Sequence, residues 1–128
     1  MKKALIILTL FTGLCLSAFA QDAPAGGLAD FTDLAGAKAF AAKGPTVLFF
    51  SADWCLFCQA DLRQFKAEGK RLGDVTVVVV DYDAAKDLKT AYKVTYQHTY
   101  VWIDSRGAAK AVWNGGGIDG ILSRVKAM

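Results

Sequence analysis

The chain has 128 residues, with 15 lysines and arginines, 12 aspartates and glutamates and one histidine, which gives a net charge of +3 at pH 7. This charge is too small to indicate nucleic acid or an anionic surface as a partner. Three cysteines are too few for a disulfide-stapled scaffold, and the length is that of one small domain with its own hydrophobic core.

The first segment, residues 1–20, is typical of a secretory signal peptide. Lys2 and Lys3 precede an apolar run, and Ala18-Phe19-Ala20 offers a small-x-small cleavage site. We expect cleavage near Ala20, a mature chain that begins at Gln21, and a location in a bacterial periplasm or outside the cell.

Two alternatives for this segment are less favoured. Lipidation of Cys15 would need a small residue before it, and the chain has Leu14 there. A retained membrane anchor would need a longer apolar run. Cleavage removes Cys15 together with two lysines, so that 13 basic residues, 12 acidic residues and two cysteines remain.

Residues 21–29 are rich in alanine and glycine and are expected to form a flexible leader before a domain at residues 30–128. Asp30, with Asp33 three residues later, predicts the N-cap of an amphipathic helix. This helix is expected to end at Gly44-Pro45.

Two apolar runs, residues 46–50 and 75–80, predict strands that are covered on both faces. The segment between them, residues 55–72, has apolar residues on one face and predicts a crossover helix that joins parallel strands. Asp83 is expected to cap a shorter helix that ends at Tyr92.

The last part of the chain predicts a hairpin and a helix. Residues 99–103 and 108–113 flank the turn Asp104-Ser105-Arg106-Gly107. Three glycines at 115–117 then separate the hairpin from a final amphipathic helix. The element order is α-β-α-β-α-β-β-α, which indicates a layered α/β domain.

Cys55 and Cys58 lie where the first strong strand meets the crossover helix. Unpaired backbone N–H groups at a helix N-terminus favour a thiolate, so we expect Cys55 to be the attacking nucleophile. Cys58, one turn further in, is expected to be less exposed and to resolve a mixed disulfide. The alternatives are half of a zinc site or an inert structural disulfide.

The run Ala52-Asp53-Trp54-Cys55-x-x-Cys58, together with the element order, resembles the thioredoxin family over residues 30–128, and most closely the periplasmic thioredoxin-like domains of bacterial disulfide-reductase systems. The resemblance implies a thioredoxin fold with a central mixed sheet of about four strands. It also implies a monomeric or weakly dimeric thiol:disulfide oxidoreductase without an organic cofactor. Its partners would be protein thiols and disulfides and a redox partner protein, such as a membrane electron donor.

One departure from the family concerns its cis-proline. Aligning Tyr96-Gln97-His98-Thr99 with that loop places His98 where the proline belongs. A cis bond before a residue other than proline costs about 3 to 4 kcal/mol, so we expect a trans peptide. His98 is a candidate modulator of the Cys55 thiolate, and the alternative is a solvent-facing loop histidine.

The same substitution opens an alternative function. Cys55, Cys58 and His98 offer two sulfurs and a nitrogen to zinc or, across a dimer, to an iron–sulfur cluster. A fourth ligand is missing from the monomer. We therefore predict a thiol:disulfide oxidoreductase without a bound metal, and a metal-binding module is the alternative.

Two further departures concern proton transfer and redox direction. Phe49 stands where the family often has a buried acid that shuttles the proton of the resolving cysteine. Asp53 and Asp61 could replace it through water, but we expect Asp53 to cap the helix and Asp61 to be solvated. The apolar pair Leu56-Phe57 adds no cation beside the thiolate, which favours a reductase over an oxidase.

A substrate groove is expected around the thiols. If the fold is right, Trp54, Tyr96, Gln97 and Gly115 lie there and can accept an extended polypeptide by backbone hydrogen bonds. The alternative for Trp54 is a packing residue beside the site.

Overall fold

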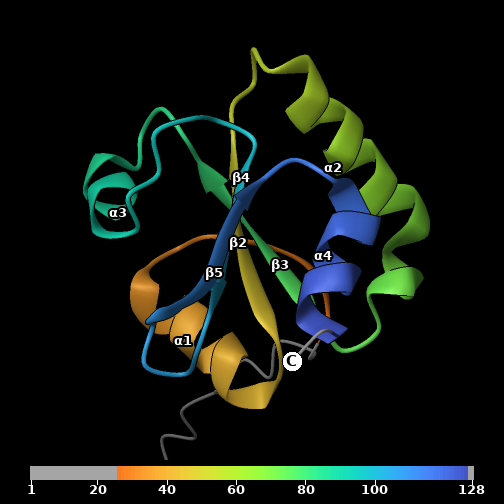
Figure 1. Cartoon of the computed structure of the whole chain (residues 1–128), viewed down its shortest axis with the longest axis horizontal. Helices are drawn as coiled ribbons and strands as arrows, with labels where there is room; N and C mark the ends of the chain where they lie inside the picture. The colour runs from red at the N-terminus through yellow and green to blue at the C-terminus, as the bar shows by residue number, and fades with distance from the viewer. Residues whose placement is uncertain (1–25, 127–128) are drawn as a thin grey trace, which may run out of the picture.

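A computed structural model describes residues 26–126, and in these residues five strands form one sheet (Figure 1). Their order is β1-β3-β2-β4-β5. β1 and β2 run parallel to β3, whereas β4 runs antiparallel to β2 and β5. The elements are β1 (Gly27–Asp30), α1 (Leu34–Lys43), β2 (Thr46–Ser51), α2 (Leu56–Glu68), η1 (Gly69–Leu72), β3 (Thr76–Asp81), α3 (Lys86–Ala91), β4 (Thr99–Ile103), β5 (Ala109–Asn114) and α4 (Gly117–Lys126).

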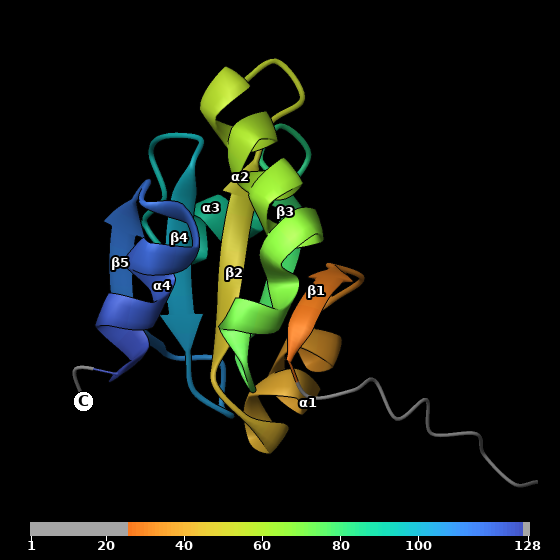
Figure 2. The same cartoon turned by 90° about the vertical axis from the view of Figure 1, so that its right-hand side faces the viewer.

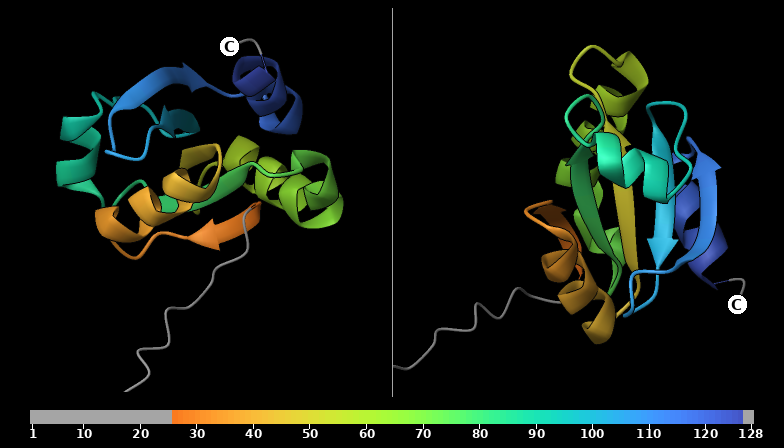
Figure 3. Two further views of the ribbon diagram at one scale, coloured as in Figure 1. Left: turned by 90° about the horizontal axis from the view of Figure 1, so that it is seen from below. Right: turned by 90° about the vertical axis from the view of Figure 1, so that its left-hand side faces the viewer.

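The helices form a layer on each face of the sheet. Figure 2 shows α2 and α4 in front of the strands, and the views in Figure 3 show α1 and α3 on the other face. The predicted α/β architecture, the parallel crossover through α2 and the hairpin of β4 and β5 are therefore confirmed. The sheet has one strand more than the four that we expected.

The additional strand is β1, within the segment expected to be a flexible leader. Residues 27–29 pair with Thr76, Val77 and Val78 of β3 instead of remaining free. The backbone N–H of Gly26 also donates to the Thr76 hydroxyl at 3.0 Å. The sequence of β1 is short and contains glycine, so it has no local strand signal. Pairing with β3 makes these residues a strand. The predicted signal peptide lies outside the described residues.

Two predicted helix caps are wrong. α1 is capped by Asp33 and not by Asp30, and the Asp33 carboxylate accepts from Gly36 N at 2.6 Å. α3 begins at Lys86 without a side-chain cap. Asp81 accepts from the N–H of Asp83 instead, which leaves the Asp83 carboxylate for another partner.

The core is divided by the sheet into two clusters, because successive strand residues point to opposite faces. One cluster lies under α2 and α4 and includes Phe49, Cys55, Cys58, Tyr100 and Trp113. The other lies under α1 and α3 and is mostly aliphatic, with members such as Leu48, Phe50, Val78, Val101 and Ile103. We call these sides the thiol face and the aliphatic face.

Among residues 26–126, no helix combines the length and the apolar character needed to cross a bilayer.

Candidate active site

Cys55 and Cys58 are placed by the turn from β2 into α2. Cys55 is the N-cap residue of α2, and its sulfur accepts a hydrogen bond from the Cys58 N–H at 3.2 Å. Both are free thiols in this structure. The cap was expected from Asp53, and this prediction is wrong because the Cys55 sulfur takes the position and Asp53 is exposed. The N–H of Cys58, in the first turn of α2, therefore points toward the sulfur of Cys55.

The two thiols differ in their surroundings. Cys58 has no accessible surface and Cys55 has 5%. Burial, followed by the hydrogen bond with Cys55, raises the pKa of the Cys58 thiol from 9.0 to about 11. Cys58 is therefore a neutral thiol at neutral pH, and it must lose a proton before it can attack another sulfur.

His98 lies in the loop before β4 with a left-handed backbone, φ +63°, which is uncommon for a residue other than glycine. No peptide bond among the described residues is cis, so the bond before His98 is trans, as expected. Its N–H donates to Phe50 O at 2.8 Å, and its carbonyl accepts from Gly115 N at 2.9 Å. These bonds tie the loop to the residues at the ends of β2 and β5.

The imidazole of His98 contacts α2 through a carboxylate and not through a thiol. Nε2 lies 2.6 Å from Asp61 Oδ2, and the ring stacks on Phe57 with a centroid distance of 6.1 Å. Within residues 26–126, neither cysteine is hydrogen-bonded to the imidazole. His98 thus lies at the edge of the sheet where the thiols are, but its partner is Asp61.

Asp61 is the site residue that sequence analysis placed wrongly. It was expected to be solvated, yet its side chain is only 17% exposed. Its Oδ2 also accepts a hydrogen bond from the Tyr100 hydroxyl at 2.5 Å. Both partners are far along the chain, 37 and 39 residues away, so no local pattern signals the cluster.

Tyr100 is held between two aromatic rings. Phe49 stacks on it at 4.5 Å with an interplanar angle of 9°, and Trp113 stacks at 5.6 Å and 10°. Burial, and then the hydrogen bond to Asp61, raise the pKa of Tyr100, and the two cysteines contribute in the same direction. Tyr100 therefore remains a neutral hydrogen-bond donor, close enough to the thiols to interact with their charge.

The predicted groove residues gather at this same edge. Trp54 follows β2, Tyr96 and Gln97 precede β4, and Gly115 follows β5. Trp54 is 60% exposed, and its Nε1 donates to the Asp83 carboxylate at 2.9 Å. Trp54 is therefore an anchored surface residue and not part of the core.

Large apolar side chains are exposed around the buried sulfurs. Besides Trp54, the exposed fractions are 82% for Leu56, 74% for Phe57 and 70% for Tyr96. By contrast, the backbone carbonyls of the loop are engaged within the protein. Those of residues 95, 96 and 97 accept from the side chains of Tyr82, Thr99 and Asn114, respectively. The edge thus offers apolar surface more readily than backbone acceptors.

The alternative metal site does not form among the described residues. No group of three or more histidine, cysteine, aspartate or glutamate side chains in that part of the chain is arranged to hold a metal ion. His98 Nε2 is occupied by Asp61, so the imidazole cannot use that nitrogen beside the two sulfurs.

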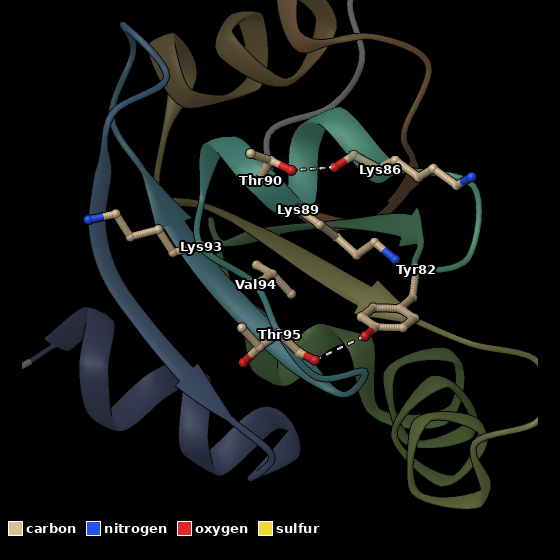
Figure 4. A pocket seen from close by; sticks show the side chains of 7 residues that line it. All are labelled: Tyr82, Lys86, Lys89, Thr90, Lys93, Val94 and Thr95. Carbon is tan, nitrogen blue, oxygen red and sulfur yellow. Dashed lines mark hydrogen bonds between the residues drawn. The ribbon is translucent and has the colours of Figure 1, made fainter.

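A hollow of about 430 Å³ lies between α3 and the loop before β4 (Figure 4). Its lining includes Tyr82 and three lysines but no cysteine. Lys89 Nζ lies 3.8 Å above the Tyr82 ring, and this ring forms a T-shaped pair with Trp54 at a centroid distance of 6.5 Å. The hollow is thus a neighbour of the site and does not contain its sulfurs.

No protein-family model and no curated protein sequence matches this chain. Solved structures of thioredoxins do match it. A Schistosoma mansoni thioredoxin has a TM-score of 0.66 and 22% identity, over 80% of this chain and 95% of that one. Thioredoxin O2 from Arabidopsis thaliana has a TM-score of 0.61 and 21% identity, over 80% of this chain and 95% of that one.

A protein called Trxlp from Edwardsiella tarda has a TM-score of 0.60 and 23% identity, over 77% of this chain and 96% of that one. These identities are low, but all three superpositions cover nearly the whole of the other chain. The five-stranded mixed sheet with helices on both faces has the same architecture. The chain therefore has the thioredoxin fold.

Proposed function

We propose that the protein is an exported thiol:disulfide oxidoreductase that acts as a reductase on partner proteins. The observation that carries this proposal is the pair of unlike thiols at the start of α2. Cys55 receives the N–H of Cys58 on its sulfur, whereas Cys58 is fully buried and neutral. A sulfur that caps a helix and accepts a hydrogen bond can attack a disulfide of a partner. A buried thiol within reach of that sulfur can then resolve the mixed disulfide.

In this mechanism the Cys55 thiolate attacks a disulfide of the partner and forms a mixed disulfide. Cys58 then loses its proton and attacks the Cys55 sulfur, so that the partner leaves as a thiol and the Cys55–Cys58 pair becomes oxidised. The neighbouring Leu56 and Phe57 add no positive charge beside Cys55, which supports a reductase. A reductase needs a donor that restores both thiols, such as a membrane protein.

The exposed ring of Trp54, Leu56, Phe57 and Tyr96 is the proposed contact surface for a partner protein. Apolar and aromatic side chains of this size dominate the centres of protein interfaces. Because the carbonyls of residues 95 to 97 are already engaged, apolar contact would contribute more than strand addition.

The first test is the reduction of a protein disulfide by the purified protein with a chemical reductant. We expect Cys55→Ser to abolish exchange and Cys58→Ser to accumulate a mixed disulfide. Ser105→Ala, in the exposed turn between β4 and β5, is the control and should keep full activity. A reduction potential near about −270 mV would support a reductase, whereas one near about −120 mV would indicate an oxidant.

Export is tested separately by fractionation of the producing cells and by sequencing the N-terminus of the protein. We expect the mature chain to start at Gln21. A full-length chain that remains in the cytoplasm would contradict this part of the proposal without affecting the chemistry.

A further inference from the structure

The resolving thiol raises a chemical problem that the cysteines alone do not solve. In the reduced protein the pKa of Cys58 is about 11, and burial, the largest cause of this shift, does not depend on whether Cys55 is a free thiol or is bound to a partner. Phe49, on the strand below, brings an aromatic ring and no base to this region. Fast resolution therefore requires a proton acceptor close to Cys58.

The geometry points to Asp61 as that acceptor, an inference that rests on the proposed function. Asp61 lies three residues after Cys58 on α2, and residues at this spacing lie on one helix face with Cβ atoms about 5 to 6 Å apart. The side chains of Cys58 and Asp61 are both largely withdrawn from solvent. A proton can cross this separation directly or through one water molecule.

The two carboxylate oxygens of Asp61 have different surroundings. Oδ2 accepts from both His98 and Tyr100, whereas Oδ1 receives no hydrogen bond from any residue in the described part of the chain. Oδ1 lies beside Gly117, where an added Cβ would come within 3.3 Å of it. His98 and Tyr100 therefore hold the carboxylate through Oδ2, and Oδ1 remains available to accept a proton.

His98 and Tyr100 are positioning residues in this arrangement. His98 holds Asp61 from the loop before β4, and Tyr100 holds it from β4 between two aromatic rings. The titratable groups hydrogen-bonded to Asp61 are these two side chains, and Cys58 precedes Asp61 by three residues on the same helix. α4 brings the backbone of Gly117 to Asp61.

Three further charged groups lie near the ends of these helices. Arg71 of η1 pairs with Glu68 of α2 and with Asp119 of α4, and all three are exposed. One positive and two negative charges leave a net −1 that is screened by solvent, and none of the three groups is hydrogen-bonded to Asp61.

The step conserves atoms and electrons. The Cys58 proton passes to Asp61 Oδ1, and the Cys58 sulfur forms a bond with the Cys55 sulfur. The bond between Cys55 and the partner breaks, and the partner sulfur leaves with the electron pair. The cysteine pair is oxidised by two electrons, the partner is reduced by two, and Asp61 later releases its proton to water.

Stopped-flow mixing of the reduced protein with an aromatic disulfide, 5,5′-dithiobis(2-nitrobenzoate), separates the two steps. Attack by Cys55 releases the first nitrothiobenzoate at a rate that depends on reagent concentration. Attack by Cys58 releases the second at a rate that does not. Because this leaving thiolate needs no proton, the second phase reports how fast Cys58 is deprotonated and attacks.

We expect Asp61→Asn to slow the second phase about 100-fold at pH 7 and to change the first less than about threefold. The slow phase of this variant should accelerate about tenfold per pH unit, because only the thiolate fraction of Cys58 then reacts. Asp53→Asn, which removes an exposed carboxylate two residues before Cys55, is the matched control and should alter neither phase.

A structural role for Asp61 is distinguished by rescue. Asp61→Glu should recover part of the rate, and added formate should accelerate the second phase of Asp61→Ala. A second phase that is as fast in Asp61→Asn as in Asp53→Asn, or a folded Asp61→Ala that formate does not accelerate, would overturn the inference. If the wild-type protein lacks the first phase, the proposed function itself fails, and the inference fails with it.

Discussion

The two faces of the sheet use neighbouring residues of the same strands for different purposes. On β2, Phe50 points into the aliphatic face, among Val78, Val101 and Ile103. The adjacent Phe49 points into the thiol face, where it stacks on Tyr100. Both rings are fully buried, but Phe49 lies at the site, where it contacts the rings of Tyr100 and His98.

This difference shows how a small domain can combine stability with reactive chemistry. The buried residues of the aliphatic face are apolar, so packing dominates there, and the hydroxyls of Tyr82 and Tyr92 at its margin donate to backbone carbonyls. The thiol face buries Cys58 and Tyr100 and largely buries Asp61 and His98, and Asp61 joins Tyr100 and His98 by hydrogen bonds. The two faces should therefore respond differently to the same substitution.

The largest effect is expected from truncating the two adjacent phenylalanines. Phe50→Ala should lower the free energy of unfolding by about 3 to 5 kcal/mol, since it leaves a cavity in the aliphatic face. Exchange activity per folded molecule should change less than about twofold. Phe49→Ala is the matched variant and should lose both stability and activity, because it removes a ring that supports Tyr100.

Denaturant titration and exchange assays under folding conditions measure these two effects. A folded Phe50→Ala that has lost exchange activity would break the distinction between the two faces.

A smaller effect is expected from raising the pH, and only on the thiol face. Burial raises the pKa of Cys58 from 9.0 to about 11, so the folded thiol keeps its proton where the unfolded thiol loses it. The reduced protein should therefore be progressively destabilised between pH 9 and pH 11, by roughly 2 kcal/mol from this group.

The measurement compares denaturant stability of the reduced wild type with that of Cys58→Ser across this range. The serine variant lacks the thiol and should lose less stability as the pH rises. Parallel curves for the two proteins would show that Cys58 has the same proton affinity in the folded and unfolded chains.

The smallest effect concerns the backbone of His98. Because φ is +63°, His98→Gly should be more stable than His98→Ala by about 1 kcal/mol. Both variants lose the bond to Asp61 equally, so their difference isolates the backbone. Lys66, inside α2, is a control at which alanine should be better than glycine by about 1 kcal/mol. Thermal or urea unfolding measures both pairs, and equal stability of the two His98 variants would mean that the loop relaxes.

Sequence patterns were sufficient for the elements that have a local signal. The apolar runs of β2 and β3, the turn at Asp104 and the cysteine spacing predicted the strands, the hairpin and the position of the thiols. β1 escaped prediction because its four residues show little strand character and are ordered by pairing with β3. Local patterns also placed the cap of α1 three residues too early, since both Asp30 and Asp33 have a suitable side chain.

The Asp61 cluster could not be predicted from spacing. Asp61 follows Cys58 by three residues, but nothing nearby in the sequence shows that His98 and Tyr100 will meet it. Only the packing of α2 against β4 and its preceding loop brings the three side chains together. The sequence showed a histidine at the position of the family's proline, but it did not show that Asp61 would be the partner of this histidine.

The direction of β1 has a practical consequence for handling the protein. Gly27 of β1 and Thr46, the first residue of β2, both pair with Thr76 of β3, so they lie at the same end of the sheet. The two cysteines come after the last residue of β2, at the opposite end. Six strand residues separate these ends, which is about 20 Å. A bead, an electrode or a fused domain joined directly to Gly26 would therefore attach at the opposite rim of the sheet and leave the edge that contains the thiols accessible to partners.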